Sequence, residues 1–109
     1  MPKMTRDAIA YMADHHTNVW DIPAVSSPAE QRGHPGPCPV ELPYRCLLAY
    51  TQPRGRVLDP FAGSGTSLIA CEKSSRTALV VERMPSYCDM IVRRWEELTG
   101  GKAELCERT

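Results

Sequence analysis

The chain has little that would mark it for a charged partner or a membrane. Its 13 basic and 13 acidic residues cancel, whereas a nucleic-acid surface is usually basic. No run is apolar enough to cross a bilayer, and the N-terminus lacks the pattern of a signal peptide. With two Trp, four Tyr and one Phe, the core must be mostly aliphatic. We therefore predict one small domain of 109 residues with no membrane segment.

The five cysteines include no Cys-x-x-Cys pair, and their odd number does not indicate a disulfide framework. A reduced, cytoplasmic compartment is the simplest account of them. Asp14-His15-His16 and the pair of His34 and Cys38 contain metal-ligating residue types. Neither has further ligands at a matching spacing, so we predict no metal site.

The most informative stretch is Val57–Ser67, in which an apolar pair and an acidic residue lead into a glycine turn. The apolar pair favours a buried parallel strand. Gly63 and Gly65 allow positive φ and the close approach of a ligand. Thr66 and Ser67 offer hydroxyls for the start of a helix. Strand, Gly-x-Gly turn and helix form the first half of a nucleotide-type βαβ unit, whose ligand lies beyond the carboxyl end of the strand.

The residues around this turn indicate a ligand without phosphate. Leu68 stands where a dinucleotide-binding turn has its third glycine, and no Gly-Lys-Ser/Thr follows as in a P-loop. Asp59 at the strand tip would repel a pyrophosphate and suits an ammonium group. The next strand, Thr77–Val81, ends at Glu82, which is placed to accept both hydroxyls of a ribose. A ribose joined to an amino acid indicates S-adenosylmethionine, and the alternative is an unliganded turn that its glycines merely shape.

Helical periodicity surrounds this unit. Residues 1–17 are weakly amphipathic, and residues 19–22 favour a short extended segment that ends at Pro23. Helices are predicted from about residue 42 to 50, from 67 to 73, and from 85 until Gly100-Gly101 ends the last one. The expected inward faces are Leu42, Cys46, Leu47 and Tyr50 in the first of these helices, Leu68, Ile69 and Cys71 in the second, and Tyr87, Ile91, Trp95 and Leu98 in the third.

The order of these motifs resembles one family. The segment His34-Pro-Gly-Pro-Cys-Pro39, a helix, the turn, the strand to Glu82 and Pro85-Ser-Tyr87 are similar to the C-terminal part of DNA amino-methyltransferases. These enzymes methylate adenine N6 or cytosine N4, and in their permuted, beta-type subclass the proline segment directly precedes the cofactor turn. Residues 18–23 resemble the family's segment ahead of that histidine, so the match covers about residues 18–98.

The resemblance implies an α/β fold, namely an incomplete Rossmann-like methyltransferase fold with a parallel sheet in three α/β/α layers. It divides the chain into an N-terminal extension and loop at 1–33, an S-adenosylmethionine-binding part at 34–100 and a frayed tail at 101–109. The methionine end of the cofactor would lie against the turn, Glu82 would hold the ribose, and Met84 would lie near the adenine. The implied cofactor-binding residues are His34, Pro35, Asp59, Pro60, Phe61, Ala62, Gly63, Ser64, Gly65, Thr66, Glu82, Arg83 and Met84.

The chain also departs from the family's pattern. Met84 stands where Asn or Asp commonly caps a helix, and Ser75 stands where a glycine usually ends one. The family's catalytic motif, Asp/Asn/Ser-Pro-Pro followed by an aromatic residue, is absent, so no residue is assigned a catalytic role. At most 33 residues precede the proline segment, where the subclass carries its catalytic loop and its DNA reader.

Three readings follow from that absence. The first is a fragment, or one half of a split enzyme, that acts on double-stranded DNA only in a larger assembly with a complementary half or by self-association. The second is an inactive remnant that serves as an interaction module. The third is a small methyltransferase that acts on RNA or a small molecule.

Overall fold

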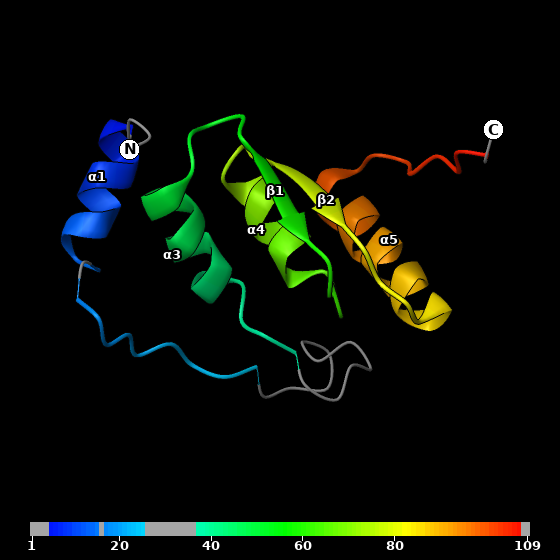
Figure 1. The fold of residues 1–109 in the computed structure, drawn as a ribbon, viewed down its shortest axis with the longest axis horizontal. Helices are drawn as coiled ribbons and strands as arrows, with labels where there is room; N and C mark the ends of the chain where they lie inside the picture. The colour runs from blue at the N-terminus through cyan, green and yellow to red at the C-terminus, as the bar shows by residue number, and fades with distance from the viewer. Residues whose placement is uncertain (1–4, 16, 26–36, 108–109) are drawn as a thin grey trace.

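The computed structural model describes residues 5–15, 17–25 and 37–107 of the chain (Figure 1). Helices and strands follow one another along the sequence and keep the order expected for a βαβ unit flanked by helices. In chain order the elements are α1 (Arg6–Ala13), α3 (Glu41–Tyr50), β1 (Arg56–Asp59), α4 (Thr66–Lys73), β2 (Thr77–Val80) and α5 (Pro85–Thr99).

The two strands pair in parallel, with Arg56 opposite Thr77 and Asp59 opposite Val80. The hydrogen bonds continue past the strand ends into the turn. Val81 N–H donates to the Asp59 carbonyl at 2.9 Å, and Ala62 N–H donates to the Val81 carbonyl at 3.0 Å. The turn that follows β1 is therefore tied to the chain that follows β2, as the βαβ prediction requires.

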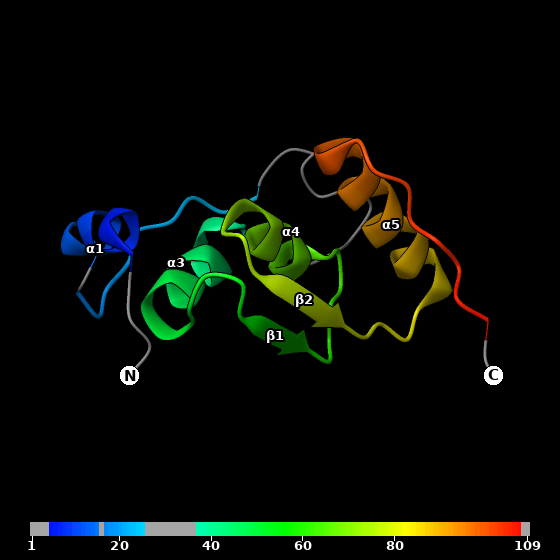
Figure 2. The ribbon, with the colours of Figure 1, turned by 90° about the horizontal axis from the view of Figure 1, so that it is seen from above.

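One face of this small sheet is covered by helix α4, with α3 and α5 on either side of α4 (Figure 2). Ala70 and Cys71 are fully buried beneath the sheet and, with Leu47 of α3, form the core. Val57 and Ala78, one from each strand, pack against that cluster. Small residues in α4 let the helix approach the sheet closely, which is how so small a core is filled.

The other face of the sheet carries no helix within the described residues (Figure 2). Leu58 is 68% exposed and Leu79 is 52% exposed on this open face, and Val81 continues it beyond β2. The Rossmann-like α/β fold predicted from the sequence is confirmed in this partial form. Of its three expected layers, the described residues form two.

The buried face of α3 differs from the predicted one. Of the four residues expected to face inward, only Leu47 is buried, whereas Tyr50 is 75% exposed and Leu42 and Cys46 also face outward. The buried positions are Arg45, Leu47 and Leu48. Apolar spacing was misleading here because Arg45 is buried through its ion pair with Glu41 and its contact with the Trp20 ring.

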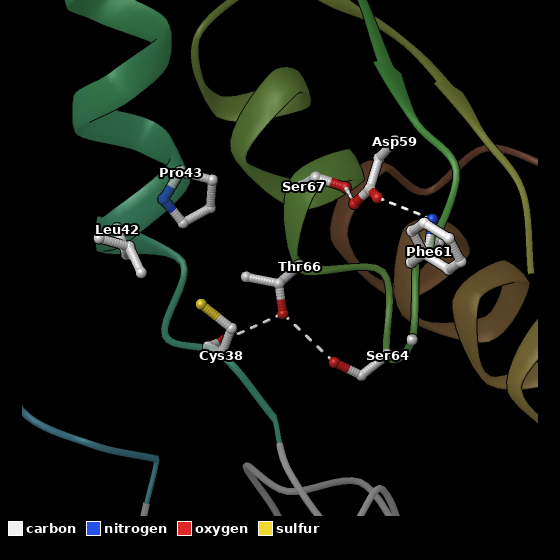
Figure 3. A pocket seen from close by; sticks show the side chains of 10 residues that line it. Cys38, Leu42, Pro43, Asp59, Phe61, Ser64, Thr66 and Ser67 are labelled. Carbon is white, nitrogen blue, oxygen red and sulfur yellow. Dashed lines mark hydrogen bonds between the residues drawn. The ribbon is translucent and has the colours of Figure 1, made fainter.

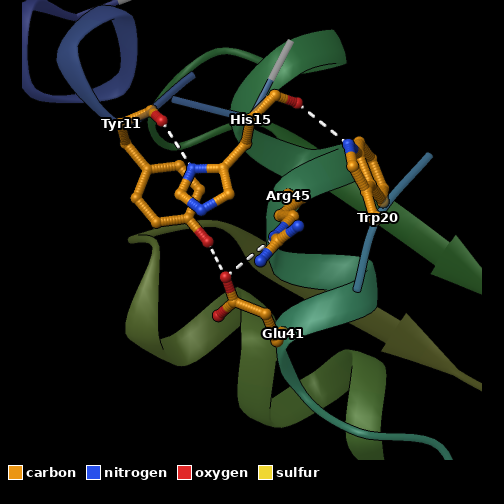
Figure 4. A network of polar contacts seen from close by, with 5 residues as sticks. All are labelled: Tyr11, His15, Trp20, Glu41 and Arg45. Carbon is orange, nitrogen blue, oxygen red and sulfur yellow. Dashed lines mark hydrogen bonds and ion pairs between the residues drawn. The ribbon is translucent and has the colours of Figure 1, made fainter. Parts of the chain in front are cut away.

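A polar network joins the N-terminal segment to α3 (Figure 4). The Tyr11 hydroxyl donates to Glu41, and the same carboxylate accepts Arg45 Nε at 2.9 Å. The Arg45 guanidinium lies 5.5 Å from the centroid of the Trp20 ring, and Trp20 Nε1 donates to the His15 carbonyl at 2.9 Å. These contacts satisfy the buried arginine, and they hold Trp20 in a segment where no strand forms between residues 17 and 25.

The ends of α5 follow the predicted signals. Met84 is the N-cap without a side-chain capping bond, Pro85 opens the helix, and Gly100 ends it with φ 73°. The described residues that follow hold no helix or strand, although Ala103 N–H donates to Glu96 Oε1 at 2.9 Å. No helix in the described ranges combines the length and apolar content that a membrane crossing demands.

Candidate functional site

The predicted turn carries a structured carboxylate at the tip of β1. Asp59 Oδ1 accepts the Phe61 N–H at 3.0 Å, and Oδ2 accepts the Ser67 hydroxyl at 2.5 Å (Figure 3). The second distance is typical of a charge-assisted O–H···O⁻ bond. Asp59 therefore connects the end of the strand to the first turn of α4, and its carboxylate is held in one orientation at the mouth of the turn.

A second carboxylate reaches the same turn from β2. Glu82 Oε2 accepts the Gly63 N–H at 2.7 Å, and Oε1 accepts the Met84 N–H at 3.0 Å. Each oxygen thus receives a backbone donor, and a carboxylate has about four acceptor positions in all. The two acidic residues singled out in the sequence are brought to the same turn from adjacent strands.

The turn itself needs both glycines. Gly63 and Gly65 have φ 58° and 84°, which an L-residue adopts only with strain. A Cβ on Gly65 would lie 3.0 Å from Ile91 Cγ1, so α5 packs directly against the backbone there. Gly65 is also the N-cap of α4 and provides no side-chain cap. The prediction that the Thr66 and Ser67 hydroxyls serve the start of the helix was therefore wrong. The Thr66 hydroxyl donates to the Cys38 carbonyl, and the Ser67 hydroxyl donates to Asp59.

A cavity of about 320 Å³ opens beside the turn (Figure 3). Its walls come from the proline-rich segment, the start of α3, the tip of β1 and the start of α4. The residues that line it are Cys38, Leu42, Pro43, Asp59, Phe61, Ala62, Gly63, Ser64, Thr66 and Ser67. Phe61, 88% exposed, stands at its rim, where a bound molecule would cover the ring.

The remaining predicted residues lie elsewhere. Glu82 contacts the turn through Gly63 without lining the cavity, and Arg83 and Met84 follow it as exposed residues. Pro60 is exposed outside the cavity, and Gly65 faces α5 rather than the open space. His34 and Pro35 lie outside the described residues.

Four lining residues were absent from the predicted site: Cys38, Leu42, Pro43 and Ser67. The proline segment was expected near the site, and the Thr66 hydroxyl holds it there through a 2.9 Å bond to the Cys38 carbonyl. Desolvation raises the pKa of the Cys38 thiol, and the neighbouring Cys46 adds to the rise. Leu42 carries a sequence signal, since it is an apolar residue in the first turn of the predicted helix, close to the proline segment.

The site places one carboxylate and an aromatic ring in a small concave space, and a second carboxylate is bound to the same turn. It suits a ligand with a positively charged group near Asp59 and hydroxyls near Glu82. In the described ranges no three His, Cys, Asp or Glu residues are grouped as metal ligands would be. Two carboxylates at one turn favour an organic cation over a phosphate.

Comparison with known proteins shows the family to which the chain belongs. The family model described as DNA methylase matches residues 1–93. The type II methyltransferase M2.MboI of Moraxella bovis is 36% identical over 83 residues, which are 75% of this chain and 30% of that protein. The DNA adenine methyltransferase YhdJ of Escherichia coli is 36% identical over 88 residues, 80% of this chain and 30% of its own length.

A solved structure gives the same result for the fold. The complex of M1.HpyAVI with S-adenosylmethionine superposes with a TM-score of 0.62 at 31% identity, over 68% of this chain and 36% of that one. The chain thus spans less than a third of the length of the two curated relatives and little more than a third of the solved one.

Proposed function

Since this chain belongs to the N6/N4 DNA methylase family, we propose that it is the S-adenosylmethionine-binding portion of a site-specific DNA methyltransferase. The observation that carries the proposal is the pair of carboxylates, Asp59 and Glu82, that adjacent parallel strands bring to one glycine turn. S-adenosylmethionine presents an ammonium and a sulfonium at one end and a ribose diol at the other. A second support is the cofactor named in the complex of the related M1.HpyAVI.

Each predicted residue then has a role. Asp59 and the turn that follows it, through Thr66, face the methionine end, where Phe61 covers the ligand. Glu82 accepts the ribose hydroxyls, and Met84, with Arg83 beside it, lies near the adenine. The family resemblance assigns His34 and Pro35, which lie outside the described residues, to the methionine side.

The catalytic step requires residues that this sequence lacks. No Asp/Asn/Ser-Pro-Pro-aromatic tetrapeptide occurs in it. We infer that the catalytic loop and the DNA reader come from another region, either of a longer protein or of a second polypeptide in a split enzyme. The open apolar face of the sheet and the one-third coverage of the relatives support this. The assembled enzyme would then methylate adenine N6 or cytosine N4 in double-stranded DNA.

Titration calorimetry tests the cofactor. We expect S-adenosylmethionine or its demethylated product to bind, and NAD to bind more weakly. Glu82→Gln should weaken binding by about 1–3 kcal/mol, because an amide nitrogen, which can only donate, replaces one of the two carboxylate oxygens. Glu104→Gln, in the exposed tail, is the control that should not change it. Equal or tighter binding of NAD would overturn the assignment of the cofactor.

Complementation tests the missing half. The chain alone should transfer no radiolabelled methyl group to DNA, and a separate polypeptide with an Asp-Pro-Pro-Tyr motif should restore transfer. If the folded chain binds no cofactor at all, the remnant that serves as an interaction module becomes the better reading. Methyl transfer by the unaided chain to RNA or a small molecule would instead support a small stand-alone enzyme.

DNA binding by the chain alone should be weak and without sequence preference. The basic and acidic residues balance, so few phosphate contacts are expected. A fluorescence anisotropy titration at physiological salt measures this affinity. A sequence-specific complex of nanomolar affinity would show that the DNA reader lies in this chain after all.

A further inference from the structure

The Thr66 hydroxyl is the meeting point of three segments that are distant in sequence. Thr66 is buried at the start of α4. Its Oγ1 lies 2.9 Å from the Cys38 carbonyl oxygen, 3.2 Å from the Ser64 hydroxyl and 3.3 Å from Arg94 Nη1 of α5. The same Nη1 also donates to the Ser64 carbonyl at 3.3 Å. One guanidinium thus contacts both the glycine turn and the residue that holds the proline segment.

The chemistry of these groups fixes the direction of each bond. A hydroxyl has one proton to donate and two lone pairs that accept. Arginine can only donate and a carbonyl can only accept, so Thr66 accepts from Arg94 and donates to Cys38. The Ser64 hydroxyl must then be the donor to Thr66. Because the first donor is a cation, it polarises the Thr66 hydroxyl and strengthens the bond that this hydroxyl donates.

We propose that Arg94 is a positioning residue for the cofactor pocket and acts through Thr66. Arg94 does not line the cavity, whereas Cys38 and Thr66 both do. By orienting the Thr66 hydroxyl, Arg94 holds the Cys38 carbonyl, and with it one wall of the cavity, against the glycine turn. The role rests on the proposed function, since the pocket is the one assigned to S-adenosylmethionine.

Affinity for S-adenosylmethionine, measured by calorimetry on the full chain, gives the first readout. Arg94→Met should weaken binding about tenfold, the loss expected for one charge-assisted hydrogen bond. Arg94→Lys, which keeps a cationic donor, should recover part of that loss and serves if the methionine variant folds poorly. Arg93→Met changes the exposed neighbour on the same helix and should leave the affinity unchanged.

A double-mutant cycle separates positioning from general stability. Thr66→Val removes the hydroxyl and keeps the shape of the side chain. In that background Arg94→Met should weaken cofactor binding by less than about twofold, since the group it acts through is gone. Thermal unfolding is measured in parallel. Fully additive losses of affinity would overturn the proposal and leave Arg94 as an ordinary packing residue.

The alkylation rate of Cys38, followed by mass spectrometry without cofactor, gives a readout independent of the proposed function. Its surroundings raise the pKa of this thiol, so release of the proline segment should speed its reaction with iodoacetamide several-fold. Cys106 in the exposed tail is the internal reference. Faster alkylation in Arg94→Met, with no cofactor binding by the parent chain, would support positioning and refute the proposed function. Cofactor binding by the parent chain, with neither readout moved in Arg94→Met, would refute positioning alone.

Discussion

The two faces of the β1–β2 sheet are similar in sequence and different in structure. Val57 and Ala78 point to the core under α4, and Leu58 and Leu79 alternate with them on the open face. Strands with apolar residues on both faces are typical of parallel sheets that are covered on both sides. Only one side is covered by the described residues. This difference agrees with the proposal that a further region of the enzyme covers the open face.

The proposed cofactor pocket lies at the tip of β1, beside the helices that cover one face of the sheet. Thr66 and Ser67, which fix the proline segment and Asp59, belong to the helix that covers it. Nothing on the open face contributes to the cavity lining. Cofactor binding and association with a second half can therefore be disturbed separately, and the following predictions use that separation.

The largest effect is expected from a cavity on the covered side. Leu47, 7% exposed, belongs to the core cluster that Val57 and Ala78 pack against, and Leu47→Ala should lower the free energy of unfolding by about 2–5 kcal/mol. Leu79→Ala on the open face should change it by less than about 0.5 kcal/mol. Urea denaturation at a concentration where the chain is monomeric measures both. Equal losses would show that the open face is buried in the isolated chain.

The next effect concerns the backbone contact between the turn and α5. Gly65→Ala should cost about 2–4 kcal/mol, because it combines a left-handed backbone with a clash against Ile91. Gly100→Ala is the matched control, since φ is also positive there and a Cβ would meet nothing within 4 Å. The difference between the two losses isolates the packing contribution. If the losses are equal, contact with Ile91 does not constrain the turn.

Self-association should follow the open face. An exposed apolar face beside an unpaired strand edge favours association, so the parent chain should sediment as more than a monomer at micromolar concentration. Leu58→Lys should shift it toward the monomer and leave cofactor affinity unchanged. Leu105→Lys, in the exposed tail, adds the same charge and should have no effect. An oligomer unaffected by Leu58→Lys would place the interface elsewhere.

The smallest effect is a gain in stability at the entry to β2. Ser75 has φ 61°, where the family usually has glycine, so Ser75→Gly should raise the free energy of unfolding by about 0.5–1 kcal/mol. Neither face of the sheet changes. Ser74→Gly next to it should instead destabilise, because Ser74 is buried and its hydroxyl donates to the Ala70 carbonyl at 2.7 Å. Thermal denaturation of the pair checks the sign of each effect.

Local chemistry made much of the fold predictable. The bounds of α4, β2 and α5 follow from glycines, prolines and short apolar runs that act on their own neighbours. The meeting of Asp59 and Glu82 at one turn was predictable, since carboxyl ends of parallel strands meet at one edge. That the residues of this turn hold the cofactor stays a prediction.

Tertiary contacts decided the rest. The start of α1 is the exception because it is local: the Thr5 hydroxyl accepts the Ala8 N–H at 3.2 Å, a capping signal that the prediction missed. The buried face of α3 depends on Arg45. Its guanidinium contacts the Trp20 ring and pairs with Glu41, and the apolar pattern does not predict these contacts. The sequence gives no signal for the contacts of Arg94, since Ser64 and Thr66, which its guanidinium contacts, are distant in the chain.

The parallel pairing of β1 with β2 has a consequence for the order of folding. Each residue of β1 pairs with a residue the same number of positions further along the chain, and the glycine turn with α4 is the whole connection between them. Pairing of the strands brings the two ends of this connection together, so we expect the folding nucleus to include the glycine turn. We expect Gly65→Ala to act mainly by slowing refolding, with a φ-value well above that of Leu98→Ala at the exposed end of α5. Stopped-flow refolding of both variants would measure these φ-values and show whether the glycine turn forms early in folding.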